Sequence, residues 1–182
     1  MDGDPDLTTN DPIAGLRRRR PDLFDAPDFW RTDLAQIHEA VAGARKGTAC
    51  ALGRSAGGRE IPAVAYGPFE PQRPTATISS ALGSDRPQTF FDPALRTRPV
   101  LVLIGAIHGG EAEGVAVALD LIHLLETETD TAGRRRPDLS SLLEKARLVI
   151  VPCLNPDGRA RAGVRHLNNA ELDDLFLVQQ GL

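Results

Sequence analysis

The sequence predicts an α/β fold in which a mixed, largely parallel sheet is flanked by helices. Residues 100–107 and 148–151 are unbroken apolar runs, as expected of strands that are covered on both faces. Between them, residues 112–128 carry apolar side chains at helical spacing. Because a strand, a helix and a second strand follow one another in this order, we expect a parallel pair joined by a right-handed crossover.

The chain before this unit divides into a leader and the first helix of a domain. Residues 1–26 are rich in Asp, Pro and Arg and show little apolar periodicity, which predicts a flexible leader. The domain then covers residues 27–182. Its first helix is expected to begin after Asp28 and to end at Gly43 or Gly47, because apolar residues recur there at steps of three and four.

A glycine-rich turn and a short strand come next. The turn covers residues 51–60 and the strand residues 61–66, where Pro62 favours an edge or the start of a strand. Residues 67–99 contain six prolines and form a long connection. After the crossover helix, residues 139–145 predict another short helix.

Composition and charge argue against several kinds of partner. The chain has 182 residues, with 21 Lys+Arg against 25 Asp+Glu, and the net charge of −4 provides no attraction for nucleic acid or an anionic membrane. Aromatic residues make up 4%, which disfavours base stacking, and no apolar run approaches the roughly 20 residues of a membrane span. Cys50 and Cys153 lack the spacing of a metal knuckle, and no signal peptide is visible, so the default expectation is a cytoplasmic protein.

The loop after the first apolar run holds the candidate metal ligands. Ligands of α/β sheets bind beyond the carboxyl ends of the strands, and His108 and Glu111 lie at such an end on either side of two glycines. Zinc accepts imidazole nitrogen and carboxylate oxygen, and a catalytic zinc takes three protein ligands and a water. The same spacing recurs at His123 and Glu126, but inside an apolar helix, where a contact along the helix face is the better interpretation.

The loop after the second apolar run contains Asn155-Pro156-Asp157-Gly158, which local chemistry explains as a tight turn. Three arginines follow it, at positions 159, 161 and 165. A guanidinium near a metal can grip a substrate carboxylate with two hydrogen bonds, and a solvated basic loop explains the same pattern. The residues by themselves leave both interpretations open.

Three segments, in this order, resemble the zinc carboxypeptidases of the M14 type. Residues 53–61 resemble the family's G-[KR]-S-x-x-G-R-x-I segment, residues 107–114 its zinc-ligand motif H-x-x-E, and residues 151–158 its N-P-D-G segment. The resemblance extends over about residues 50–165. It implies a carboxypeptidase-like fold of the zinc-exopeptidase type, with residues 27–182 as the N-terminal portion of the domain.

The resemblance also implies roles for individual residues. His108 and Glu111 would be two of three ligands to Zn2+, and Arg161 or Arg165 would bind the substrate or its tetrahedral intermediate, without the spacing deciding between the two arginines. The zinc would polarise the scissile carbonyl and activate a water, and a glutamate would act as general base.

Other parts of the family pattern are missing. The third ligand and the general base of the family lie well beyond N-P-D-G, whereas the later histidine and glutamate of this chain, His166 and Glu171, follow too closely. The asparagine–arginine pair that holds a terminal carboxylate is also absent from the sequence. We therefore expect a sheet and a site that are incomplete at the C-terminus, exposed apolar surface, and little or no turnover.

Three functions are compatible with these observations. The first is a zinc-dependent metallocarboxypeptidase-like hydrolase of peptide (amide) bonds, which in this chain lacks the third zinc ligand and the general-base glutamate. The second is a deacylase of N-acyl amino acids with a related fold. The third is a non-catalytic carboxypeptidase-like binding module. The N-P-D-G and G-R-S segments favour the first.

Overall fold

One mixed sheet organises the computed structural model, which describes residues 11–68, 78–85 and 98–179. Its four strands are arranged in the order β1-β2-β4-β3. β1 (Thr48–Arg54) and β4 (Arg147–Val151) run antiparallel to β2 (Glu60–Tyr66), and β3 (Val100–Ile104) runs parallel to β4. The predicted α/β class with a mixed, helix-flanked sheet is confirmed. The sheet is not largely parallel as predicted, because only the β3–β4 pair of the three described strand pairs is parallel.

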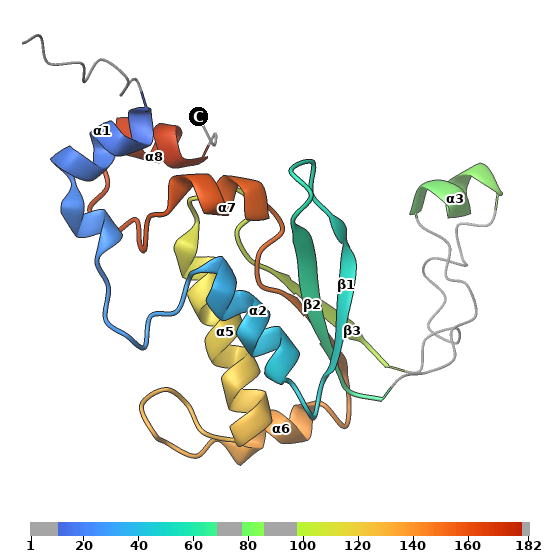
Figure 1. The fold of residues 1–182 in the computed structure, drawn as a ribbon. Coiled ribbons are helices and arrows are strands. Elements are labelled where there is room, and N and C mark those ends of the chain that lie inside the picture. The colour runs from blue at the N-terminus through green and yellow to red at the C-terminus, as the bar shows by residue number, and fades with distance from the viewer. Residues whose placement is uncertain (1–10, 69–77, 86–97, 180–182) are drawn as a thin grey trace, which may run out of the picture.

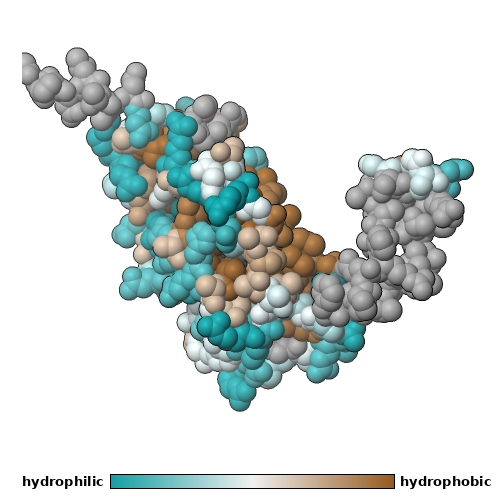
Figure 2. Space-filling view, turned by 45° about the vertical axis from the view of Figure 1, so that its right-hand side comes forward, coloured by the Kyte–Doolittle hydropathy of each residue, from teal (hydrophilic) through white to brown (hydrophobic). Residues whose placement is uncertain are grey.

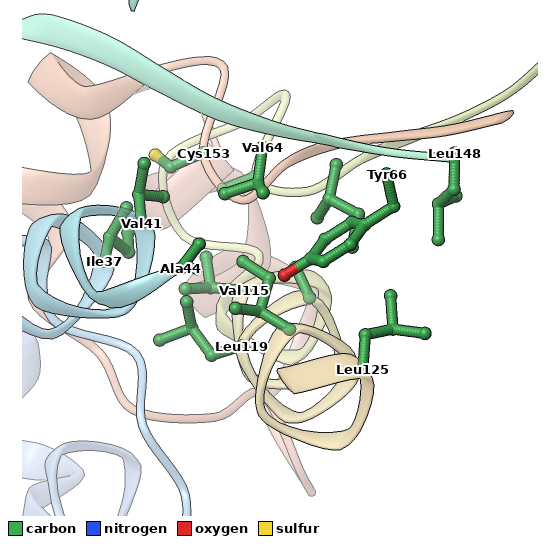
Figure 3. Packing of buried hydrophobic residues seen from close by; sticks show 14 residues of the cluster. Ile37, Val41, Ala44, Val64, Tyr66, Val115, Leu119, Leu125, Leu148 and Cys153 are labelled. Carbon is green, nitrogen blue, oxygen red and sulfur yellow. The ribbon is translucent and has the colours of Figure 1, made fainter. Parts of the chain in front are cut away.

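The predicted strand–helix–strand unit is present as β3, α5 (Ala112–Thr127) and β4. Figure 1 shows α5 lying beside α2 (Leu34–Gly43) on the same side of the sheet. The predicted apolar stripe of α5 is buried there and packs with residues of α2, β2 and β4, as Figure 3 shows. Tyr66 is 1% exposed and places its ring within this core.

The prediction that residues 100–107 are covered on both faces is wrong. The side chains of β3 are largely exposed, at 51% for Val100 and 65% for Leu101. In the described part of the chain β3 pairs with β4 alone, so one of its edges has no neighbouring strand. Figure 2 shows a band of apolar surface, in brown, across the middle of the molecule. The expected exposure of apolar surface is therefore confirmed for the described residues.

The N-terminal segment departs from the predicted flexible leader of residues 1–26. α1 (Pro12–Arg19) and a short 3-10 helix, η1 (Pro21–Phe24), occupy much of it. Leu16 and Leu23 are fully buried in a second apolar cluster, against Val164 and Val178 near the other end of the chain. Residues 1–10 lie outside the described residues, and the domain boundary at residue 27 stays a prediction.

The first predicted helix begins later than expected. α2 starts at Leu34, because the side chain of Gln36 accepts hydrogen bonds from the backbone N–H groups of Thr32 (2.8 Å) and Asp33 (3.0 Å). Phe29, the first residue of the helix expected after Asp28, is 62% exposed and precedes α2. The predicted end of the helix at Gly43 is confirmed.

Part of the predicted glycine-rich turn is strand β1, which forms a hairpin with β2. Because β2 is an inner strand, Pro62 is not at an edge of the sheet. It lies near the start of β2, as the alternative predicted, before the pairing with β4 begins at Val64. The register shifts between Ala51 and Gly53, opposite Pro62, and such an irregularity accommodates a residue that has no N–H to donate.

The remaining described helices are short: α3 (Ile78–Gly83), α6 (Pro137–Leu142), α7 (Pro156–Ala162) and α8 (Leu172–Gln179). The predicted tight turn at residues 155–158 is in fact the start of α7. The Asn155 side chain accepts a hydrogen bond from the Gly158 N–H at 2.8 Å, and Pro156 occupies the first turn, where its missing N–H costs nothing. Among the described helices, we find none with the length and apolar character that crossing a membrane requires.

Candidate metal centre

His108 and Glu111 converge in the loop between β3 and α5, which we call the metal loop (residues 108–111). His108 Nδ1 lies 2.8 Å from Glu111 Oε1, and the His108 backbone N–H donates to Glu111 Oε2 at 3.1 Å. Partial burial alone would raise the pKa of Glu111, but the hydrogen bonds from the ring and backbone of His108 outweigh it and lower this pKa. Both side chains remain accessible, with exposed fractions of 55% and 35%.

This pair fits two positions of a zinc site. Zinc–nitrogen and zinc–oxygen bonds of about 2.0–2.2 Å in a tetrahedron place ligand atoms about 3.4 Å apart. The observed separation of 2.8 Å between His108 Nδ1 and Glu111 Oε1 needs only a small opening to reach this value. Within the described ranges, no three side chains of His, Cys, Asp or Glu gather in one place. Among the described residues, His108 and Glu111 are therefore two candidate ligands without a third beside them.

The two glycines of the metal loop lie against two helices. A Cβ atom on Gly109 would overlap the backbone of Gly158 and Arg159 at the start of α7. A Cβ atom on Gly110 would lie 2.7 Å from Val178 Cγ2 and 2.9 Å from the Val178 carbonyl oxygen in α8. The loop can approach α7 and α8 this closely only because both residues lack a side chain.

Arg159 contacts the metal loop, although the sequence did not predict a role for it there. Its side chain is 2% exposed, and its guanidinium donates to the carbonyl of Gly109 at 3.1 Å and to the carbonyl of Val164. Burial lowers the pKa of Arg159. The helical phase of α7 could have indicated this burial, since Arg159 is three residues from both Pro156 and Ala162, which are buried too.

The two arginines proposed as substrate ligands have different surroundings. Arg161 is exposed on α7. Arg165 donates to the Trp30 carbonyl at 2.7 Å and to Asp33 Oδ2 at 3.3 Å, so that its side chain is 20% exposed. The chain just after Arg165 lies against the start of α5, where the Leu167 N–H donates to Glu113 Oε1 at 2.6 Å. The segment that carries Arg165 thus returns to the helix that begins at the metal loop.

The carboxylate of Asp157 on α7 accepts hydrogen bonds from the turn between β1 and β2. Asp157 accepts hydrogen bonds from the Ser55 hydroxyl (2.9 Å), the Gly57 N–H (2.8 Å) and Arg59 Nη1 (2.7 Å). The Gly57 N–H and the Arg59 guanidinium, in this order, hold the pKa of Asp157 below its usual range. Two of the three segments that carry the resemblance are therefore joined directly.

Comparison with known proteins agrees with this arrangement. The profile of the zinc carboxypeptidase family (Peptidase_M14) matches residues 44–170, which include the metal loop and α7. This chain belongs to the zinc carboxypeptidase family. The resemblance predicted from the sequence is thereby confirmed, and with it membership of a family of metallocarboxypeptidases, which are hydrolases.

Individual relatives match over limited lengths. Carboxypeptidase D of Mus musculus is 38% identical over 64 residues, which are 35% of this chain and 4% of that protein, and carboxypeptidase D of Homo sapiens is 36% identical over 64 residues. Among solved structures, a putative carboxypeptidase A from Shewanella denitrificans has a TM-score of 0.46 and 20% identity, covering 81% of this chain and 27% of that one. A metallo-carboxypeptidase from Burkholderia cenocepacia has a TM-score of 0.46 and 21% identity, covering 72% and 26%. The chain spans a small part of each.

Proposed function

We propose that this chain carries the His108 and Glu111 part of the zinc site of a metallocarboxypeptidase-like hydrolase that acts on peptide bonds. The observation that supports this proposal is the 2.8 Å approach of the two side chains at the end of β3, inside the stretch that matches the family. A bound Zn2+ would polarise the scissile carbonyl and activate a water for attack. The metal loop would supply two ligand atoms to this ion, an imidazole nitrogen of His108 and a carboxylate oxygen of Glu111.

The neighbouring residues would supply order and substrate binding. Arg159 fixes the Gly109 carbonyl from the interior, which holds the loop backbone between the two ligands. Arg161 and Arg165 are the candidates for binding a substrate carboxylate or the tetrahedral intermediate, and a guanidinium suits both because it donates two parallel hydrogen bonds. Arg161 is exposed, whereas Arg165 would have to give up its bond to Asp33.

The proposal includes weak zinc binding and little or no hydrolysis by the 182-residue chain. Two ligands hold zinc less tightly than three, and the described residues gather no third one. His166 and Glu171, the later residues of the right chemical type, have other contacts. The His166 ring accepts a hydrogen bond from the Asn168 N–H at 3.2 Å. Glu171 is exposed just before α8, where its backbone N–H donates to Asp174.

Zinc titration of the purified chain and three variants tests the ligand assignment. We expect His108→Ala and Glu111→Ala each to weaken binding by at least about tenfold, because each removes one of the ligands that set the affinity. His123→Ala is the matched control, since His123 belongs to the pair with the same spacing on α5 and bonds to Thr127 there. Equal affinity in all four proteins would show that zinc binds elsewhere.

A substrate panel tests the chemistry. Zinc-loaded chain is incubated with short peptides that have a free C-terminus and with N-acyl amino acids. Slow peptide cleavage that disappears in His108→Ala supports the proposed hydrolase. Cleavage confined to N-acyl amino acids would favour the deacylase, and zinc-independent binding without cleavage would favour a binding module.

A further inference from the structure

We propose that the β1–β2 turn (residues 54–60) is a brace for the metal loop, and that Ser55 and Arg59 are positioning residues that act through Asp157 and α7. This inference rests on the proposed function in one respect, the assignment of a metal to residues 108–111. The brace itself is a chain of contacts that links three segments far apart in the sequence.

The first contact is between the turn and the first turn of α7. Three donors, the Ser55 hydroxyl, the Gly57 N–H and the Arg59 guanidinium, meet on the one carboxylate of Asp157 at 2.7–2.9 Å. Ser55 Oγ in turn accepts the Arg59 N–H at 3.0 Å, which closes the turn on itself. A Cβ atom on Gly57 would lie 2.5 Å from Asp157 Oδ1, so the carboxylate fits against bare backbone. The position of Asp157 is thus fixed from three directions.

The second contact is between α7 and the metal loop. Asp157 is followed at once by Gly158 and Arg159, whose backbone atoms leave no room for a side chain at Gly109. Arg159 also reaches from the interior to the Gly109 carbonyl. A shift of the first turn of α7 would therefore move the backbone that separates the two proposed zinc ligands.

The exposure of the brace argues for positioning over general stabilisation. The Arg59 and Asp157 side chains are 47% and 30% exposed, and exposed ion pairs contribute little to folding stability. Several charge-assisted hydrogen bonds that converge on one carboxylate nevertheless define its place closely. Metal affinity depends on such outer contacts because they orient the ligands.

Hydrogen exchange of the metal-free chain tests the brace independently of zinc. The reporter is the Glu111 amide, which donates to the His108 carbonyl at 3.1 Å within the loop. We expect Ser55→Ala and Arg59→Ala to speed its exchange by about tenfold while the amides of β4 keep their rates, because only the loop is released. Arg59→Lys, which keeps the cation, should restore part of the protection. Arg134→Ala is the matched control, since Arg134 also pairs with an aspartate, Asp130, at 2.9 Å, but in the loop after α5 and outside the brace.

Zinc titration of the same variants provides the second readout. Affinity should fall by about tenfold in Arg59→Ala and remain unchanged in Arg134→Ala. Unchanged exchange at Glu111 in Arg59→Ala would overturn the brace. Equal acceleration in β4 and the loop would also overturn it, because it would show a general structural role. If the unmodified chain binds no zinc, the proposed function fails, and the exchange measurement still decides on the brace.

Discussion

Glu126 of α5 is the side chain whose replacement tests the packing of the core most directly. Its Oε1 accepts the Tyr66 hydroxyl at 2.9 Å and the Gly47 N–H at 3.1 Å, and its Oε2 accepts the N–H groups of Arg45 and Lys46 at 2.9 and 3.0 Å. One carboxylate thus joins the end of α2, the start of β1 and the buried ring of β2 to the crossover helix. The perturbation is Glu126→Gln, which keeps the shape and removes the charge.

The expected cost follows from counting donors and acceptors. A glutamine offers one oxygen and one NH2 group, so an oxygen turned toward Arg45 and Lys46 leaves the NH2 group facing the Gly47 N–H, with which it cannot bond. The Tyr66 hydroxyl can rotate and accept from this NH2 group. The bond from the Gly47 N–H is lost, and the remaining hydrogen bonds are no longer strengthened by a charge. The loss of charge assistance costs about 1 kcal/mol for each remaining bond, and the partial exposure of the site reduces this cost. We expect the free energy of unfolding to fall by about 2 kcal/mol.

The effect should depend on pH in a defined direction. Burial alone would raise the pKa of Glu126, but the three backbone N–H groups and the Tyr66 hydroxyl outweigh it and lower this pKa. A carboxylate whose pKa is lower in the folded state adds stability that is complete above its unfolded value of about 4.3 and is lost as the pH falls through the folded value. The difference between the original chain and Glu126→Gln should therefore be full at neutral pH and shrink below about pH 4.

Urea unfolding followed by the fluorescence of Trp30 at neutral pH and at about pH 3.5 measures both effects. Glu39→Gln is the control, because this α2 carboxylate is 76% exposed and pairs with Arg31 on the surface. A loss below about 0.5 kcal/mol for Glu126→Gln, or a loss of equal size at both pH values, would refute the reasoning.

Three further outcomes are expected. Gly110→Ala should lower zinc affinity and cost about 1 kcal/mol of stability in urea unfolding, because the new methyl group lies 2.9 Å from the Val178 carbonyl. Gly43→Ala, at the helical end of α2 and in open space, should not lower the stability. Arg159→Gln should cost about 2 kcal/mol in urea unfolding, since the shorter side chain leaves a buried carbonyl without its donor. Leu101→Lys on the open edge of β3 should reduce self-association in light scattering, and an unchanged particle size would contradict this.

The sequence predicts those parts of the fold whose signals are local. The α5 stripe and the β3–β4 pair follow from apolar periodicity and element order, and the structure has both. α1 could not be predicted in this way. Leu16 is buried in a cluster that includes Val178, and these two residues are more than 150 positions apart in the chain. Periodicity within one segment carries no information about such a partner.

The candidate site shows the same limit. His108 and Glu111 are predicted from their spacing and their place after a strand, and the structure brings them together. The contact of Arg159 is missed because it is made with a carbonyl at Gly109, fifty positions earlier, and because residues 155–158 suit a turn as well as a helix start. Once the start of α7 at Pro156 is known, helical geometry places Arg159 on the same buried face as Pro156 and Ala162.

The two pairs with the same spacing show what the structure adds to a motif. Spacing alone does not separate His108 and Glu111 from His123 and Glu126. In the structure, both Glu126 oxygens are taken by backbone N–H groups and the Tyr66 hydroxyl, so a metal ion would have to displace four hydrogen bonds to reach them. Glu111 bonds to His108 alone among the described contacts, and a zinc ion would replace the ring contact by binding both of its partners. Whether such a carboxylate is free to bind a metal or holds the fold together therefore depends on the donors that already surround it. For Glu126 these donors come from segments that the motif does not include.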